Sequence, residues 1–415
     1  MKPARILPWV FGLIALLGCD EESESEYRDY LVARPLTLSL EDFRSDPVVI
    51  PPQPLEQSGK IYAYGDYIFV NEPYKGVHVI DNTDPAAPRK ARFIAIPGNV
   101  DISVKDDFLF ADSLRDLVVL DISDLDNIRP VARLEGVLQD NIAWPFEAEI
   151  IESDQWDPQT EILVGWEVTT ERLPVQDAQP RMWMNDMMLA EAAAADGGTG
   201  QGGSMARFKI VGDYLYAVDS HTINVFDIAN LEAPSALEDV FAGFDIETIF
   251  SQGSHLFLGS MRGMYIYDIS SPATPAFVSE FQHGTACDPV VVDGDYAFVT
   301  LRGGNECGAT ESGLFVVDIS NISAPELLAS YPLDGPYGLG VSGSQLFVCD
   351  GDSGLRVFDK TDVANLQEVA HFAEVVTYDV IPLESHLLMV GDGTLSQYRY
   401  QAPGLELLSV LSLKD

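Results

Sequence analysis

One β-hairpin pattern recurs along the chain at intervals of about 40 residues, and this period constrains the fold more than any other feature. In the clearest copy, two β-rich runs, Tyr214 to Val218 and Ile223 to Ile228, flank a polar turn. An aspartate near the end of the second run is followed by a proline-closed loop. The aspartate recurs six times, and an arginine replaces it in a seventh, weaker copy: Asp81, Asp121, Asp227, Asp268, Asp318, Asp359 and Arg399. The spacings are 40, 106, 41, 50, 41 and 40 residues, so one long and one short insertion interrupt the period.

Each copy has room for four strands: an inner strand such as Lys60 to Tyr64, the hairpin, and an outer strand such as Ala91 to Ile96. A parallel sheet would need crossover helices, which the sequence lacks. A single four-stranded unit cannot bury its own faces, so the units must stack on one another. We therefore predict an all-β, seven-bladed β-propeller over residues 58–415, with a Trp-rich insertion at 140–204 between the second and third repeats.

The N-terminus has the pattern of an export signal. Lys2 and Arg5 precede an apolar run from Ile6 to Leu17, which is too short to span a bilayer. The sequence LLGC at residues 16–19 resembles the lipobox of bacterial lipoproteins, and this resemblance implies removal of residues 1–18 and acylation (palmitate) of Cys19. Residues 19–57, acidic and then proline-rich, are predicted to be a tether, solvated up to about residue 30 and then extended along the side of the propeller, where Leu36 to Leu40 could add an edge strand. We expect an exported, lipid-anchored protein of the cell envelope, at the outer membrane or cell surface in preference to the inner membrane.

The balance of charge limits the partners. With 24 Lys and Arg against 65 Asp and Glu, the formal net charge is −41, which argues against nucleic acid or anionic lipid as a partner. The partners that we predict are the lipid bilayer, through acylated Cys19, and a protein or glycan.

The long insertion has a composition of its own. We predict a hairpin over residues 147–168, a short helix over 181–195, and a flexible glycine-rich linker over 197–204. Trp156, Trp166 and Trp183 are candidate partner-binding residues, because Trp concentrates at interfaces. The alternative is that these side chains pack the insertion onto the propeller.

Three repeats carry a family resemblance. The segments GVHVIDNTDPAAP, DLVVLDISDLDNIRP and GLFVVDISNISAP resemble the LVIVD-repeat family of bacterial surface propellers. The resemblance implies an exported β-propeller and implies no reaction. The last repeat departs from the pattern at Arg399 and Tyr400, so its loop is in doubt.

The cysteines fit a compartment outside the cytosol. Cys287 and Cys307 fall on one face of the same predicted blade, so we predict a disulfide between them. Cys349 has the sequence context of a buried strand residue.

Alignment of the inner strands brings a mixed polar set to the mouth of the predicted channel. Candidate binding residues there are Asp101, Tyr337, Tyr378 and Asp379. Candidate catalytic residues are Glu247, Asp288, His283 and Arg207. Such a set could bind a small molecule or a cation, although the mouth of any propeller is polar because water fills it.

Known chemical motifs are missing from the sequence. No two histidines have zinc-site spacing, and the aspartate-rich turns lack the spacing of calcium loops, so no metal site and no cofactor are predicted. The one ion that the acidity of the chain leaves open is a Ca²⁺ held loosely in the channel. We expect a binding or scaffolding module for a protein or glycan. The alternative is an extracellular hydrolase or lyase with its active site at the channel mouth.

Overall fold

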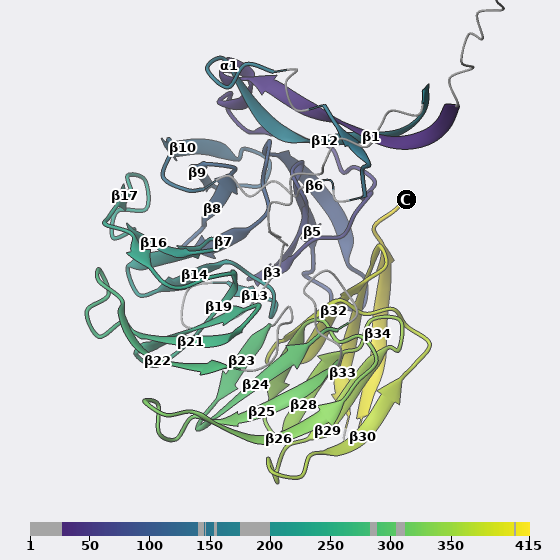
Figure 1. Cartoon of the computed structure of the whole chain (residues 1–415). Coiled ribbons are helices and arrows are strands. Elements are labelled where there is room, and N and C mark those ends of the chain that lie inside the picture. Colours follow the sequence, from purple (N-terminus) through teal and green to yellow (C-terminus); the bar gives the residue numbers. More distant parts are fainter. Residues whose placement is uncertain are drawn as a thin grey trace, which may run out of the picture.

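The computed structural model describes residues 27–139, 145, 147–152, 156–174, 200–282, 289–303, 312–401 and 404–415. Within these residues the chain forms eight sheets, and seven of them contain one hairpin repeat each (Figure 1). In these seven sheets, consecutive strands pair antiparallel in chain order. The predicted all-β fold built from repeated four-stranded sheets is therefore confirmed.

The four strand positions recur from sheet to sheet. The first strands are β3 (Ile61–Tyr64), β7 (Ile102–Lys105), β14 (Phe208–Val211), β19 (Ile246–Gln252), β23 (Val290–Asp293), β27 (Leu339–Ser342) and β31 (Asp379–Pro382). The second strands are β4 (Tyr67–Glu72), β8 (Phe108–Ser113), β15 (Tyr214–Val218), β20 (His255–Ser260), β24 (Tyr296–Leu301), β28 (Gln345–Cys349) and β32 (His386–Gly391). The third strands are β5 (Gly76–Asp81), β9 (Asp116–Asp121), β16 (Thr222–Asp227), β21 (Gly263–Asp268), β25 (Gly313–Asp318), β29 (Leu355–Asp359) and β33 (Thr394–Gln401). The outer strands are β6 (Arg89–Ala95), β10 (Arg129–Leu134), the short pair β17 (Ser235–Ala236) and β18 (Val240–Phe241), β22 (Ala276–Gln282), β26 (Glu326–Pro332), β30 (Gln367–Phe372) and β34 (Gly404–Ser412).

Burial of the strands on both faces explains why their sequences are continuous apolar runs. The second and third strands are buried on both faces, whereas outer strands such as β22 expose alternate residues. Apolar side chains of neighbouring sheets form shared cores; Phe69 and Val79 of one sheet pack with Val104 and Leu120 of the next. Stacking of sheet on sheet therefore provides the core, as the repeat pattern predicts.

The repeated aspartates close the loops after the third strands, as predicted. In all six copies the carboxylate accepts a hydrogen bond from the backbone N–H two residues later, with distances of 2.7–3.0 Å. Side-chain and backbone hydrogen bonds from Ser270 and Ser320 lower the pKa of Asp268 and Asp318, respectively. These carboxylates therefore favour their ionised form within the loop.

The first strands of the seven sheets contact one another in a cyclic order. β7 contacts β3 and β14, and contacts continue from β14 through β19, β23 and β27 to β31. β31 in turn contacts β3, the first strand of the first sheet. Strands from the two ends of the repeat array thus lie side by side.

The eighth sheet joins two segments that the sequence analysis treated separately. β1 (Tyr27–Ser39) pairs antiparallel with β12 (Glu161–Pro174) and parallel with β11 (Ile150–Ile151), in the order β11-β1-β12. The hairpin predicted over residues 147–168 is therefore wrong, because β1 lies between its two arms. β13 (Gln201–Gly202), from the end of the insertion, joins a different sheet and pairs with β3.

The predicted tether also needs correction in its described part. From Tyr27 onward it supplies β1, the short helix α1 (Leu40–Phe43) and β2 (Val48–Ile50), which extends the first sheet beyond β6. β1 includes most of the possible edge strand over Leu36 to Leu40 but begins earlier, at Tyr27, and its Arg34 pairs with Glu152 and Glu171 of the insertion. No helix in the described part of the chain is long and apolar enough to cross a membrane.

The eighth sheet lies across one side of the array and is held there by apolar and ionic contacts (Figure 1). Phe43, Leu114 and Ile162 form a small buried cluster. Beside it, the Asp116 carboxylate is fully buried and accepts hydrogen bonds from Arg44 at 3.0 and 3.2 Å and from Arg133 at 3.1 Å. Asp116 therefore connects the N-terminal segment to the second repeat.

Asp116→Asn should release this connection. The substitution keeps the side-chain shape but leaves two guanidinium groups without their carboxylate, so we expect the free energy of unfolding to fall by about 2–3 kcal/mol. Urea unfolding measures the loss, and hydrogen exchange should locate increased opening in residues 27–44. Asp392→Asn, which removes an exposed ion pair with Lys414, is the control and should change stability by less than about 0.5 kcal/mol. Equal effects of the two substitutions would contradict this role of Asp116.

Candidate functional site

Residues 200–206, which we call the central segment, lie among the first strands of several sheets. β13 pairs with β3, opposing Gln201 to Ala63 and Gly202 to Tyr62. The Gly200 N–H donates to the Val104 carbonyl of β7 at 2.9 Å, and the Gly203 N–H donates to the Ile61 carbonyl at 3.0 Å. Figure 1 shows β13 in the middle of the array, beside β3 and β14.

Ser204 and Asp379 connect the central segment to the last two sheets. The Ser204 N–H and hydroxyl both donate to Asp379 Oδ1, at 3.0 and 3.1 Å. The Ser204 hydroxyl also accepts from the Leu339 N–H at 2.6 Å. On another side, the Ala206 carbonyl accepts from the Ile249 N–H at 3.3 Å. The central segment thus bonds to strands of five sheets: β3, β7, β19, β27 and β31.

The Asp379 carboxylate leaves no room for a side chain at Gly203 of this segment, or at Gly338 just before β27. A Cβ added at Gly203 would lie 1.8 Å from Asp379 Oδ2, and one at Gly338 would lie 2.2 Å from Asp379 Oδ1. The interpretation of residues 197–204 as a flexible linker is wrong for the described residues 200–204. Their glycines allow tight packing against neighbouring strands.

Asp101 forms a second polar connection, between the first three sheets. Its side chain is 2% exposed and accepts hydrogen bonds from Lys60 Nζ at 3.2 Å and from the Phe208 N–H at 3.2 Å. The Arg207 N–H donates to the same oxygen. A buried carboxylate with this many donors stabilises the arrangement of β3, β7 and β14.

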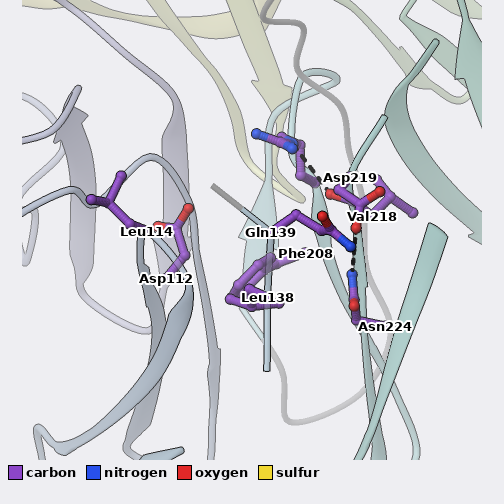
Figure 2. Close-up of a pocket in the computed structure, with 9 residues that line it drawn as sticks. Asp112, Leu114, Leu138, Gln139, Phe208, Val218, Asp219 and Asn224 are labelled. Carbon is purple, nitrogen blue, oxygen red and sulfur yellow. Dashed lines mark hydrogen bonds between the residues drawn. The ribbon is translucent and has the colours of Figure 1, made fainter. Parts of the chain in front are cut away.

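A small pocket lies next to Asp101, between the second and third sheets. Its cavity volume is about 10 Å³, which is about the space of one water molecule, and it is lined by Asp112, Leu114, Leu138, Gln139, Arg207, Phe208, Val218, Asp219 and Asn224. Figure 2 shows Asp112 on one side and Asp219 and Asn224 on the other, with Leu138 and Gln139 between them.

The polar groups of the pocket are bonded to the protein itself. Asp112 Oδ1 accepts from the N–H groups of Val100 and Asp101 at 2.7 and 2.9 Å, yet burial raises the pKa of Asp112 to about 6. Asp219 accepts from the His221 N–H at 2.8 Å and from Asn224 Nδ2 at 3.1 Å. Arg207 Nε donates to the Val218 carbonyl at 3.2 Å. These contacts join strands and present no activated nucleophile.

Of the predicted catalytic set, the structure describes Glu247 and Arg207. Glu247 is buried on β19 at 3% exposure, and Arg207 lines the pocket just described. His283 and Asp288 lie outside the described residues. Tyr337 and Tyr378 do lie together, with ring centroids 5.1 Å apart, and the Arg302 guanidinium lies 4.0 Å from the centre of the Tyr337 ring.

The remaining predicted residues are placed only in part. Trp166 lies on β12 opposite Pro35, and Trp156 is half-buried just before β12; both belong to the region of the eighth sheet. Cys349 is fully buried on β28, as expected. Trp183, the lipidation candidate Cys19, and the predicted disulfide partners Cys287 and Cys307 lie outside the described residues. The part of the chain that is described contains no cluster of three metal-ligating acidic, His or Cys side chains.

Ser204, Asp112 and Asp219 are not among the residues predicted from the sequence. A usable signal for the two aspartates was the acidic residue that recurs at the end of the second strand, as in FLFAD, YAVD and LFVCD. For Ser204 the sequence offers no comparable pattern.

The loops of the third and fourth sheets expose an aromatic group, which we call the Phe241–Phe244 patch: His221, Phe241, Phe244 and Arg262. Phe241 and Phe244 are 63% and 49% exposed, with ring centroids 5.5 Å apart. His221 packs edge-on against Phe244, and the Arg262 guanidinium lies 5.5 Å from the centre of the same ring. Exposed aromatic clusters of this kind mark interaction surfaces.

Stacked antiparallel sheets of four strands, with one repeat in each, define a propeller-like repeat protein. Three segments match the family described as LVIVD repeat: residues 97–129, 202–240 and 283–332. The chain therefore contains LVIVD repeats, as the resemblance of its hairpins predicts. None of the curated proteins gives a significant match.

Solved structures of similar fold come from several bacteria. A functionally unknown protein from Desulfotomaculum acetoxidans aligns with a TM-score of 0.53 and 12% identity over 85% of this chain and 95% of that one. A protein from Lactobacillus plantarum has a TM-score of 0.50 and 15% identity over 85% and 96%. BamB from Moraxella catarrhalis has a TM-score of 0.47 and 10% identity over 89% and 98%. At such low identities, the first two similarities show the fold alone.

Gly203→Ala should destabilise the protein, because the added methyl group collides with Asp379. We expect a loss of about 2–4 kcal/mol in the free energy of unfolding, measured by urea titration. Gly335→Ala is the matched control, since nothing lies within 4 Å of its added Cβ. If the two variants unfold at the same urea concentration, the central segment is not packed as described.

Asp112→Asn should flatten the pH dependence of stability. Burial raises the pKa of Asp112 in the folded chain to about 6. The protonated form therefore stabilises the folded chain fully at a pH below the pKa of the unfolded chain, and this stabilisation is lost as the pH rises through about 6. Relative to the variant, the wild-type chain should lose up to about 3 kcal/mol between pH 4 and pH 7. Urea unfolding across that range tests this, with the exposed Asp213→Asn as control. Parallel curves for wild type and Asp112→Asn would contradict a raised pKa.

Proposed function

We propose that the seven repeat sheets close into a seven-bladed β-propeller around the central segment. The contact between β3 and β31 supports closure, since it joins the first and last repeats. The bonds from residues 200–206 to five sheets support an axial position for this segment. In this arrangement the chain fills the centre of its own ring.

The protein is a lipid-anchored module of the cell envelope in this proposal. The support is in the sequence, where an apolar run from Ile6 to Leu17 ends in LLGC. Acylation of Cys19 would hold the propeller at a membrane after export. Mass spectrometry of the mature N-terminus tests the anchor, and an unmodified Cys19 would exclude it.

Its function is to bind or scaffold a partner, a protein or a glycan, through surface loops. The observation that carries this conclusion is that two carboxylates expected at a channel mouth, those of Asp101 and Asp379, are buried and bonded. Asp101 and Asp379 hold neighbouring strands and the central segment. This favours binding over the hydrolase or lyase that the sequence also allowed.

The Phe241–Phe244 patch is the candidate contact surface. Its two phenylalanine rings are exposed to solvent. Arg262 adds a positively charged group, which donates a hydrogen bond to the Asp245 carboxylate at 2.9 Å. Aromatic and arginine side chains contribute most of the binding energy at many interfaces.

The double variant Phe241→Ser, Phe244→Ser tests this function. Partners are first identified by in vivo crosslinking to the wild-type chain, and binding is then measured with purified components and with a glycan array. We expect the variant to lose affinity at least tenfold, because hot-spot aromatics typically contribute 2 kcal/mol or more. Leu327→Ser, at a position 51% exposed on β26, is the control. Unchanged affinity in the double variant would exclude this patch, and turnover of the captured molecule would point to an enzyme.

A further inference from the structure

The described chain is anchored in the fold from Tyr27 onward, well before the first repeat. β1 pairs with β12 along its whole length, from Tyr27 opposite Pro174 to Ser39 opposite Glu161. Arg28 forms an ion pair with Glu149, and its guanidinium lies 4.2 Å from the centre of the Tyr30 ring. The ordered body of the protein therefore begins about thirty residues earlier than the predicted start of the propeller at residue 58.

This early start shortens the distance to any anchor at Cys19. Eight residue steps separate Cys19 from Tyr27, and a fully extended chain spans at most about 3.6 Å per residue, or about 29 Å in total. A tether that ran from residue 19 to residue 57 would reach more than about 130 Å by the same rule. A protein on the shorter tether has far less freedom to turn its other surfaces toward the membrane.

The surface nearest to that anchor is the end of the eighth sheet where β1 begins and β12 ends. Tyr27 is 52% exposed, and Arg28 and Arg172 are exposed beside it. Tyrosine suits the boundary between headgroups and water, because its ring is apolar and its hydroxyl is polar. Arginine can donate to phosphate oxygens in a bidentate manner. Both arginines lie beside acidic side chains, since Arg28 pairs with Glu149 and Arg172 lies opposite Asp29, so these four groups carry no net charge.

We propose that this sheet end, formed by Tyr27, Arg28 and Arg172, faces and contacts a phospholipid surface. The proposal rests on the lipid anchor of the proposed function and adds an orientation to it. The lipid is zwitterionic, because a net charge of −41 repels an anionic bilayer. The sheet of β23–β26, on the other side of the array from β1 (Figure 1), is then directed away from the membrane.

Photocrosslinking of the full-length, acylated chain in phosphatidylcholine vesicles tests the orientation. A benzophenone amino acid replaces Arg172 in one variant, Tyr27 in a second, and the exposed Asn321, in the loop after β25, in a control. Mass spectrometry measures the lipid adducts, and circular dichroism checks that each variant is folded. We expect adducts at positions 172 and 27 and at least fivefold fewer at position 321.

A lengthened tether provides the second arm. Thirty Gly/Ser residues inserted between Glu26 and Tyr27 extend the eight steps to 38, so the adduct yield at position 172 should fall about tenfold, following the dependence of effective concentration on length. Equal yields at 172 and 321, or a yield that the insertion leaves unchanged, would overturn the orientation while the anchor stands. A chain that is not acylated at Cys19 would overturn the anchor and the orientation together.

Discussion

Buried carboxylates that accept hydrogen bonds from a neighbouring sheet hold the centre of this protein together. Asp379 accepts both donors of Ser204, and Asp101 accepts from Lys60 and from the backbone of β14. Apolar stacking alone would not fix these contacts, because it depends on area and not on direction. The directional bonds determine where the first strands and the central segment lie relative to one another.

The same contacts involve carboxylates that the sequence places at the mouth of the predicted channel. Glu247, Asp101 and Asp379 are each at most 3% exposed. Arg207 lines a pocket with two aspartates, but its backbone N–H and its Nε are both used to join strands. In the proposed function, interaction with other molecules depends on the loops and edges that the repeats expose.

The repeats could be predicted from the sequence because each one is encoded locally. Apolar runs of strand length, a polar turn and the aspartate of the following loop lie within about 30 residues, and each aspartate makes the loop hydrogen bond expected of it. The pairing of β1 with β12 could not be predicted in this way, since Val32 and Thr169 are separated by more than 130 residues. Neither strand has a turn that would indicate its partner, and the acidic residues before β1 favoured a tether.

Composition was equally ambiguous for the central segment. A glycine-rich run is compatible with a flexible linker and with close packing, and only the neighbours of Gly203 distinguish the two.

The location of this segment also bears on how similar repeats keep their order. Sheets of nearly the same sequence have apolar faces that could stack interchangeably, whereas Ser204 finds its partner, Asp379, only in the last repeat. Apolar side chains in place of Ser204 and Asp379 would still be buried, but they would no longer distinguish the last repeat from the others. A buried polar contact can therefore specify the arrangement of the sheets even where it adds little stability of its own.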